Sequence, residues 1–113
     1  MAVYVVNLVI DQGTDFAQTF NLESDASDSA LDLSGYTGAA QLRKHASSKT
    51  KYDFAVSFTA TSNGIVKIAM TDVVTTGIKA GRYIYDVLIT DGNGLKSRIV
   101  EGSALVREGA TRI

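Results

Sequence analysis

Residues 54–70 read FAVSFTATSNGIVKIAM, two stretches of alternating apolar and polar residues separated by a turn signal. Apolar side chains recur at every second position on both sides of Asn63-Gly64, which is the period of a half-buried β-strand. Asn-Gly is favoured in two-residue type I′ turns because both central residues take positive φ. The stretch therefore predicts a β-hairpin that turns at residues 61–64.

The same period extends along most of the chain. Alternating segments lie at residues 16–22, 40–43 and 83–90. The last is followed by a second turn signal at residues 91–94 and by a return strand over residues 95–106. Gly102 lies inside this return strand, where the apolar phase becomes ambiguous, so we expect either a β-bulge or the close approach of another backbone.

One segment, residues 71–81, has helical features. Thr71 is a candidate cap, Val74 and Ile78 lie four apart, and Gly81 is a candidate stop. Because the segment is short and β-branched, we expect at most one short helical turn near residues 72–79. Seven or eight short strands without βα units then predict an all-β fold, an antiparallel sandwich or barrel in one domain spanning residues 1–113.

The first strand, residues 2–10, is apolar on both faces apart from Asn7. Val3, Val5 and Val9 share one face. Either the strand is buried on both sides within its own domain, or this face packs on a neighbouring subunit, since an exposed apolar edge needs cover. Under the second interpretation, Val3, Val5 and Val9 are the candidate subunit-interface residues.

The composition excludes several function classes. The chain has no Cys, no Pro, one His and a net charge of −1. It therefore lacks the residues for a disulfide framework, a thiolate metal site or a multi-histidine site, and it lacks the basic excess typical of nucleic-acid binders. We find no signal peptide and no apolar run of the ~18–20 residues that span a bilayer. We expect the whole chain to be the mature protein, with no nucleic-acid or membrane partner.

The acidic stretch that contains Glu23, Asp25, Asp28 and Asp32 invites a calcium interpretation. The spacing does not match the alternate-residue ligand loop of calcium-binding proteins, and no bidentate Glu closes it. A solvated acidic loop between strands is the alternative that we favour, so we predict no metal site.

His45 follows Arg43 and Lys44 and is the chain's single histidine. The three residues are either an anion-binding patch or a solvated strand end and loop. No nucleophile stands at a readable spacing from His45, and Gly92-Asn93-Gly94 is too short for a dinucleotide fingerprint. We predict no catalytic residue, no cofactor and no small-molecule substrate.

Two wider patterns leave alternatives open. Tyr36, Tyr52, Tyr83 and Tyr85 could form a stacking platform, although alternating aromatic residues in strands are more often core. Residues 1–42 carry six acidic and no basic side chains, whereas residues 43–113 carry six acidic and eleven basic ones. The two parts, of net charge −6 and +5, either complement each other within one fold or give opposite faces unlike charge, which suits head-to-tail or ring assembly.

Several segments resemble a pattern of tailed-phage virion proteins, over residues 14–107. The segments are residues 31–37 (LDLSGYT), 40–44 (AQLRK), 63–68 (NGIVKI), 80–87 (AGRYIYDV), 91–94 (DGNG) and 99–102 (IVEG). The pattern is similar to the immunoglobulin-like N-terminal domain of phage baseplate upper proteins. The resemblance implies an immunoglobulin-like β-sandwich in which the hydroxyl of Tyr83 bonds back to nearby backbone at the corner that opens its strand.

The resemblance also implies a role. It indicates a non-enzymatic structural subunit of a tailed-phage particle, in the tail, baseplate, neck or capsid decoration, made in the host cytoplasm and located in the virion. Its partners would be other virion proteins and copies of itself. Family members that carry receptor-binding proteins continue into further domains, whereas this chain stops at Ile113, which favours a decorating, connecting or capping subunit. A carbohydrate- or host-surface-binding module with contacts in the end loops is the alternative.

Overall fold

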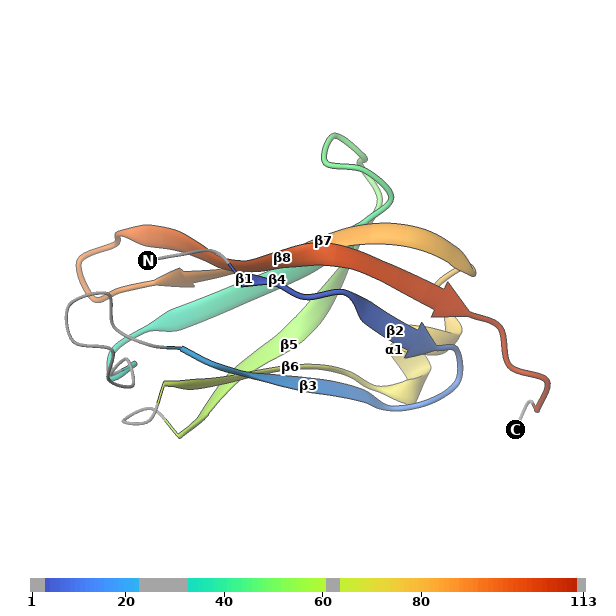
Figure 1. Ribbon diagram of the computed structural model, residues 1–113, viewed down its shortest axis with the longest axis horizontal. Helices are drawn as coiled ribbons and strands as arrows, with labels where there is room; N and C mark the ends of the chain where they lie inside the picture. The colour runs from blue at the N-terminus through green and yellow to red at the C-terminus, as the bar shows by residue number, and fades with distance from the viewer. Residues whose placement is uncertain (1–3, 23–32, 61–63, 112–113) are drawn as a thin grey trace.

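The structure is a computed structural model that describes residues 4–22, 33–60 and 64–111. In these residues it contains eight strands and one short helix (Figure 1). The elements in chain order are β1 (Tyr4–Val5), β2 (Leu8–Asp11), β3 (Phe16–Asn21), β4 (Thr37–Arg43), β5 (Lys51–Ala60), β6 (Ile65–Met70), α1 (Asp72–Thr76), β7 (Gly81–Thr90) and β8 (Lys96–Arg107). The prediction of an all-β fold with seven or eight strands and at most one short helical turn near residues 72–79 is confirmed.

The strands form one mixed sheet in the order β1-β8-β7-β4-β5-β6-β3, with β2 also paired to β8. Every neighbouring pair is antiparallel except that β1 and β2 run parallel to β8. The expectation of a wholly antiparallel sheet is therefore wrong at one edge. The hydrophobic pattern fixes which residues face the core, but it does not fix the direction of a neighbouring strand.

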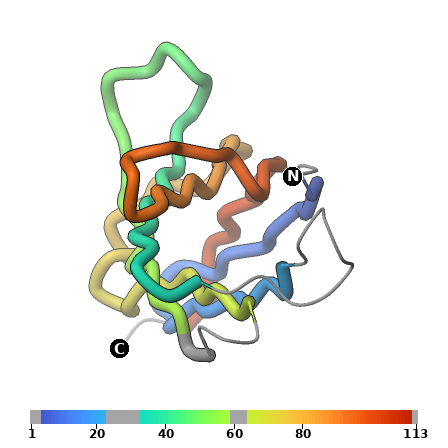
Figure 2. Tube along the Cα trace, turned by 90° about the vertical axis from the view of Figure 1, so that its left-hand side faces the viewer, coloured from blue at the N-terminus to red at the C-terminus, as the bar shows by residue number. Residues whose placement is uncertain are grey.

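Strand β5 curls the sheet into a half-barrel. Its first residues, Lys51 to Phe54, pair with β4, and its residues from Ala55 onward pair with β6. Figure 1 shows β5 crossing from the layer of β8, β7 and β4 to the layer of β6 and β3. Viewed at right angles in Figure 2, the trace curls around a common interior.

The concave interior holds one cluster of buried apolar side chains drawn from both layers. The predicted alternation is confirmed in β6, where every second side chain is buried, and in the inward-facing residues of β7. The largest side chains that are under 2% exposed are Ile10, Leu22, Leu33, Leu42, Val66, Ile68, Ile78, Val87, Ile89, Ile99, Val100 and Val106. Burial of such side chains, at roughly 1.5–3 kcal/mol each, is the main favourable contribution to folding.

The two predicted hairpins are present as strand pairs. Strands β5 and β6 are antiparallel neighbours, and Gly64 takes a positive φ of 69°; residues 61–63 of the predicted turn lie outside the described residues. Between β7 and β8, the Asp91 carboxylate accepts hydrogen bonds from the backbone N–H groups of Asn93 and Leu95, both at 2.9 Å. The return strand begins at Lys96, one residue later than predicted.

The irregularity in β8 lies at Ile99 and not at Gly102. Val87 pairs with Val100 and Leu88 pairs with Arg98, which leaves Ile99 as the extra residue of a bulge. Ile99 and Val100 are both fully buried because the inserted residue shifts the alternation by one position. The predicted bulge at Gly102 is therefore wrong, because Gly102 pairs regularly with Tyr85. The other predicted alternative, the close approach of another backbone, is confirmed: the Val6 carbonyl lies against Gly102.

Helix α1 is a single turn of five residues whose N-terminus is hydrogen-bonded by the β2–β3 turn. Thr71 is the N-cap residue but makes no side-chain capping bond, contrary to prediction. The carboxylate of Asp15, in the β2–β3 turn, accepts the Asp72 N–H instead, at 2.8 Å. The helix ends at Thr76 with Gly77 as its C-cap, whereas Gly81, expected to stop it, opens β7 with a φ of 150°. A five-residue helix cannot satisfy its own end groups, so a neighbouring loop supplies the partner.

The corner before β7 has the expected tyrosine bond. The hydroxyl of Tyr83 donates to the carbonyl oxygen of Lys79 at 2.6 Å. The Lys44 ammonium lies 4.9 Å from the centre of the same ring, a cation–π distance. These contacts join the start of β7 to the end of β4.

Candidate interaction surface

Of the seven large apolar side chains exposed in the described residues, three, Tyr4, Val5 and Val9, lie on the edge formed by β1 and β2. Val5 is 72% exposed and Val9 is 50% exposed, whereas Leu8 and Ile10 on the opposite face are buried. The interpretation that this strand is buried on both sides within its own domain is therefore wrong for these residues. Val3, the third candidate interface residue, lies outside the described residues. A sheet edge presents unpaired backbone N–H and C=O groups that can pair with another chain.

The edge is interrupted between β1 and β2, and the interruption is fixed by hydrogen bonds to β8. The Val6 N–H donates to the Glu101 carbonyl at 3.0 Å. The side-chain carbonyl of Asn7 accepts from the N–H and the hydroxyl of Ser103, both at 3.1 Å. Asn7, the one polar residue in the first apolar run, thus substitutes for a ladder bond.

Gly102 and Tyr85 both contact the carbonyl group of Val6, which lies in the interruption between β1 and β2. A Cβ built on Gly102 would lie 2.2 Å from the Val6 carbonyl oxygen, a distance that atoms do not adopt. The Tyr85 hydroxyl donates to that oxygen at 2.5 Å. Burial raises the pKa of Tyr85 to about 12, so the hydroxyl remains a donor at neutral pH. The Val5–Val9 edge is consequently presented on a fixed backbone.

An exposed ion pair closes the end of this edge. Asp11 and Arg107 meet through two contacts, Nε to Oδ1 at 2.7 Å and Nη2 to Oδ2 at 3.1 Å. The guanidinium lowers the pKa of Asp11, and the carboxylate raises the pKa of Arg107. Because both side chains are open to solvent, this two-point contact sets the strand register more than it adds stability.

The outward face of β4, β7 and β8 carries another exposed apolar side chain, that of Ile84, and an open hollow. Ile84 is 42% exposed and lies in a hollow of about 560 Å³. The remaining lining residues are Gln41, Arg43, Ala46, Tyr85, Asp86, Leu88, Arg98, Glu101 and Gly102. The lining is thus mixed, with charged side chains of both signs and the apolar side chains of Ile84, Leu88 and Ala46.

Polar side chains cross this face in a row. Glu101, Asp86, Gln41 and Asp53 lie opposite one another on successive strands β8, β7, β4 and β5. Like charges directly opposite each other are unfavourable, and here cations offset them. The Lys51 ammonium contacts Asp53 at 2.9 Å and lowers its pKa, while Arg98 contacts Asp86 at 3.2 Å.

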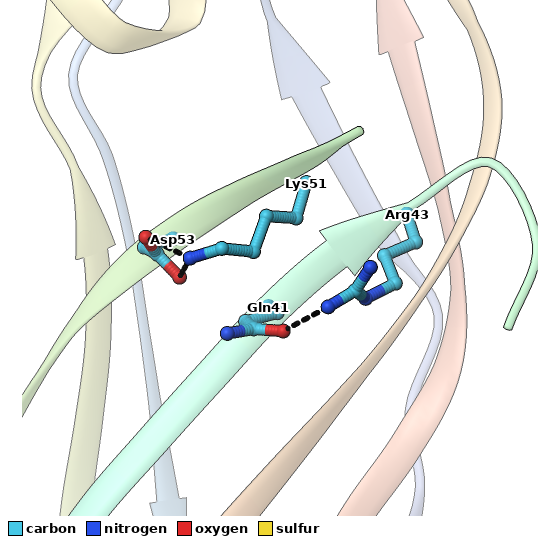
Figure 3. Close-up of polar contacts among 4 residues, drawn as sticks. All are labelled: Gln41, Arg43, Lys51 and Asp53. Atoms are coloured by element: carbon cyan, nitrogen blue, oxygen red, sulfur yellow. Dashed lines mark hydrogen bonds and ion pairs between the residues drawn. The ribbon is translucent and has the colours of Figure 1, made fainter. Parts of the chain in front are cut away.

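Figure 3 shows the β4–β5 part of this row. Lys51 reaches along its own strand to Asp53, and Arg43 reaches along β4 to the side-chain oxygen of Gln41 at 2.9 Å. Arg43 also donates to the Ser48 carbonyl within the β4–β5 loop. Arg43 is therefore a positioning cation for this loop and contributes little to an anion-binding patch.

The sequence also marked His45 and the acidic stretch from Glu23 to Asp32 as candidate sites. His45 is exposed, and its Nδ1 lies 3.1 Å from the Ser47 hydroxyl, as in a solvated loop. Glu23, Asp25, Asp28 and Asp32 lie outside the described residues, so the structure does not describe the predicted acidic loop. Within residues 4–22, 33–60 and 64–111, no three His, Asp or Glu side chains gather into a metal-binding group.

The tyrosines contribute to the core, as the structural alternative predicted. Tyr83 and Tyr85 are 8% and 4% exposed, and Tyr36 and Tyr52 pack against the same cluster. Tyr52 meets Tyr83 edge-to-face with ring centres 6.3 Å apart. A surface stacking platform of these four residues is therefore excluded.

One ion pair joins the acidic first part of the chain, residues 1–42, to the basic second part, residues 43–113. Asp11 comes from the acidic first part of the chain and Arg107 from the basic second part, and they contact across the β2–β8 pair. This is the internal complementarity that one alternative predicted. Four of the six acidic residues of the first part lie outside the described residues.

No protein-family model matches the chain, and a search of curated proteins finds no match. Among solved structures, the chain is similar to the Listeria monocytogenes internalin-like protein lmo2027, with 13% identity and a TM-score of 0.47. The match covers 95% of this chain and 28% of that chain, so this chain spans less than a third of its length.

In the part of the chain that the structure describes, α1 is the one helix, and with five residues it does not span a membrane.

Proposed function

We propose that the chain is a non-enzymatic structural subunit of a tailed-bacteriophage particle that acts through protein–protein contacts. The observation that carries this proposal is the exposure of Val5 and Val9 on a sheet edge whose backbone is fixed by Asn7, Tyr85 and Gly102. A rigid edge with apolar side chains can bind a neighbouring protein without first ordering a loop. The phage context rests on the resemblance of residues 14–107.

The fold proposal is an immunoglobulin-like sandwich. The curled sheet has a layer of β8, β7 and β4 facing a layer of β6 and β3, joined by β5. The Tyr83-to-Lys79 bond at the start of β7 matches the tyrosine corner of such sandwiches. Both features support the resemblance.

Particle composition tests the role. Particles would be purified by density gradient from lysates of cells that carry the gene, and the chain quantified by mass spectrometry. We expect the chain to band with the particles in a fixed ratio to their other proteins. A chain that remains entirely in the soluble fraction contradicts the proposal.

The alternative proposal is a carbohydrate- or host-surface-binding module. The hollow lined by Ile84 favours it, because it combines apolar side chains with Gln41, Asp86 and Arg98, side chains that hydrogen-bond sugars. A glycan-binding screen separates the two proposals. An assembly subunit shows no saccharide preference, whereas a binding module shows one that is lost in Asp86→Ala.

A further inference from the structure

Strand β3 is the sheet edge farthest from β1 and β2 in the strand order. It pairs with β6 without a break in register from Phe16 to Asn21, and no other strand in the described ranges pairs with it. Its sequence, FAQTFN, has no charge, no Pro and no Gly. Natural edge strands are usually protected by charges, Pro, bulges or short length, and β3 lacks the first three.

We propose that β3 pairs antiparallel with β3 of a second copy, so that two half-barrels share one continuous sheet across a two-fold axis. This surface lies at the opposite end of the strand order from Val5 and Val9. The proposal goes beyond the proposed function and does not depend on it.

The direction of the backbone groups fixes which residues meet. The Leu22 N–H donates to the Gly64 carbonyl at 2.8 Å, so Leu22 directs its backbone groups toward the β6 side. Directions alternate along an antiparallel strand, and Phe20, Gln18 and Phe16 therefore also bond toward β6. The N–H and C=O groups of the intervening residues, Ala17, Thr19 and Asn21, are directed toward the open edge.

Two copies can then exchange hydrogen bonds only where an odd-numbered residue lies opposite an odd-numbered residue. A register centred on Gln18 places Ala17 opposite Thr19 of the second copy. On the inner face it places Phe16 opposite Phe20 twice, and aromatic pairs of this kind stabilise antiparallel sheets. A register centred on Thr19 instead places Phe20 opposite Gln18, an aromatic ring against an amide.

Charge allows this pairing. No β3 side chain is charged, so β3 meets its copy without the like-charge repulsion that opposes most self-pairing. Lys67 lies across from Thr19, one strand behind the edge. Three strand spacings of ~4.8 Å would separate the two Lys67 strands, beyond a Debye length of ~8 Å. The contact is isologous and uses the β3 edge of both copies, so it ends at a dimer.

The chain has no Cys, so a single introduced thiol reports on one contact. In the register centred on Gln18, this residue forms a non-hydrogen-bonded pair with its own copy, the kind of pair in which side chains approach most closely. Under mild oxidation we expect Gln18→Cys to form a disulfide dimer on a non-reducing gel. Ser57→Cys, exposed on β5, is the matched control and stays monomeric. Cross-linking of Gln18→Cys no faster than that of Ser57→Cys overturns the proposal.

A mass measurement provides a second test. Light scattering should give twice the chain mass of 12.0 kDa for the unmodified protein over a dilution series. Thr19→Pro removes an N–H that is directed to the open edge and leaves the bonds to β6, so it should give a folded monomer. Should Thr19→Pro fail to fold, Ala17→Lys places a charge on the edge instead and should also give a monomer. A monomeric unmodified protein, or a dimer that persists in the folded variant, overturns the proposal.

Discussion

The hydroxyl of Tyr85 and the carbonyl oxygen of Val6, 79 positions apart in the sequence, form a hydrogen bond beneath the edge of the sheet. Tyr85 reaches Val6 past Gly102, whose missing side chain leaves the space for the Val6 carbonyl. The bond joins the first strand to the centre of β7, so the exposed valines are carried by the same rigid layer as the core.

Gly102→Ala should destabilise the protein by about 1–3 kcal/mol, because the new methyl group would overlap the Val6 carbonyl and force the first strand away from β8. Urea denaturation measures the change. Gly92→Ala is the matched control: nothing lies within 4 Å of its built Cβ, so its effect should stay within about 0.5 kcal/mol. Equal effects of the two substitutions would contradict the close approach.

The Tyr85 hydroxyl should make stability depend on alkaline pH. Its pKa is raised by burial from the ordinary value of 10.0 to about 12, so the folded state holds this proton more tightly than the unfolded state. The associated stability is complete below about pH 10 and is lost as the pH rises toward 12. Denaturation midpoints at several pH values should therefore fall more steeply in the unmodified protein than in Tyr85→Phe. Parallel curves would show that the hydroxyl is not buried.

Tyr83→Phe should lower the free energy of unfolding by about 0.5–1.5 kcal/mol, since it removes the bond to the Lys79 carbonyl and keeps the ring that Lys44 contacts. Thermal or urea unfolding provides the measurement. Tyr36→Phe is the control, because the Tyr36 hydroxyl has no hydrogen-bond partner among the described residues; it should change stability less than Tyr83→Phe.

Thr75→Val should cost about 0.5–1.5 kcal/mol of stability. Thr75 is fully buried, and its hydroxyl donates to the Thr14 carbonyl at 2.8 Å, joining α1 to the β2–β3 turn. The substitution keeps the shape and removes the hydrogen bond between the helix and the exposed Thr14. Thr76→Val, on the exposed side of the same helix, removes a bond to the Asp72 carbonyl and should cost less because water replaces it. Denaturation of both variants gives the comparison.

The alternation of apolar residues predicted the core strands well because the period of two is a direct consequence of strand geometry. The hairpin of β5 and β6 and the inward face of β7 follow from it. The tyrosine bond at Tyr83 was predicted from the resemblance of residues 80–87. These features depend on local sequence.

The rest of the fold depends on residues far apart in the chain, which local patterns do not report. The parallel pairing of β2 with β8 joins the two ends of the chain, and the bulge at Ile99 adds a residue that no turn signal marks. The clearest missed signal was Asn7. A polar residue in an otherwise apolar strand indicates a break in that strand. Its hydrogen-bond partner Ser103 directly follows Gly102, where the sequence predicts a bulge or a close backbone approach.

The measurement that tests the central claim most directly is the incorporation of Val5→Asp into particles. Val73→Asp is the matched control, because Val73 is a 79% exposed valine that belongs to α1 and not to β1 or β2. Mass spectrometry of gradient-purified particles would quantify each variant chain, with circular dichroism confirming that both fold. The account predicts that Val73→Asp enters particles at the normal level and that Val5→Asp is depleted. Normal incorporation of Val5→Asp would contradict it.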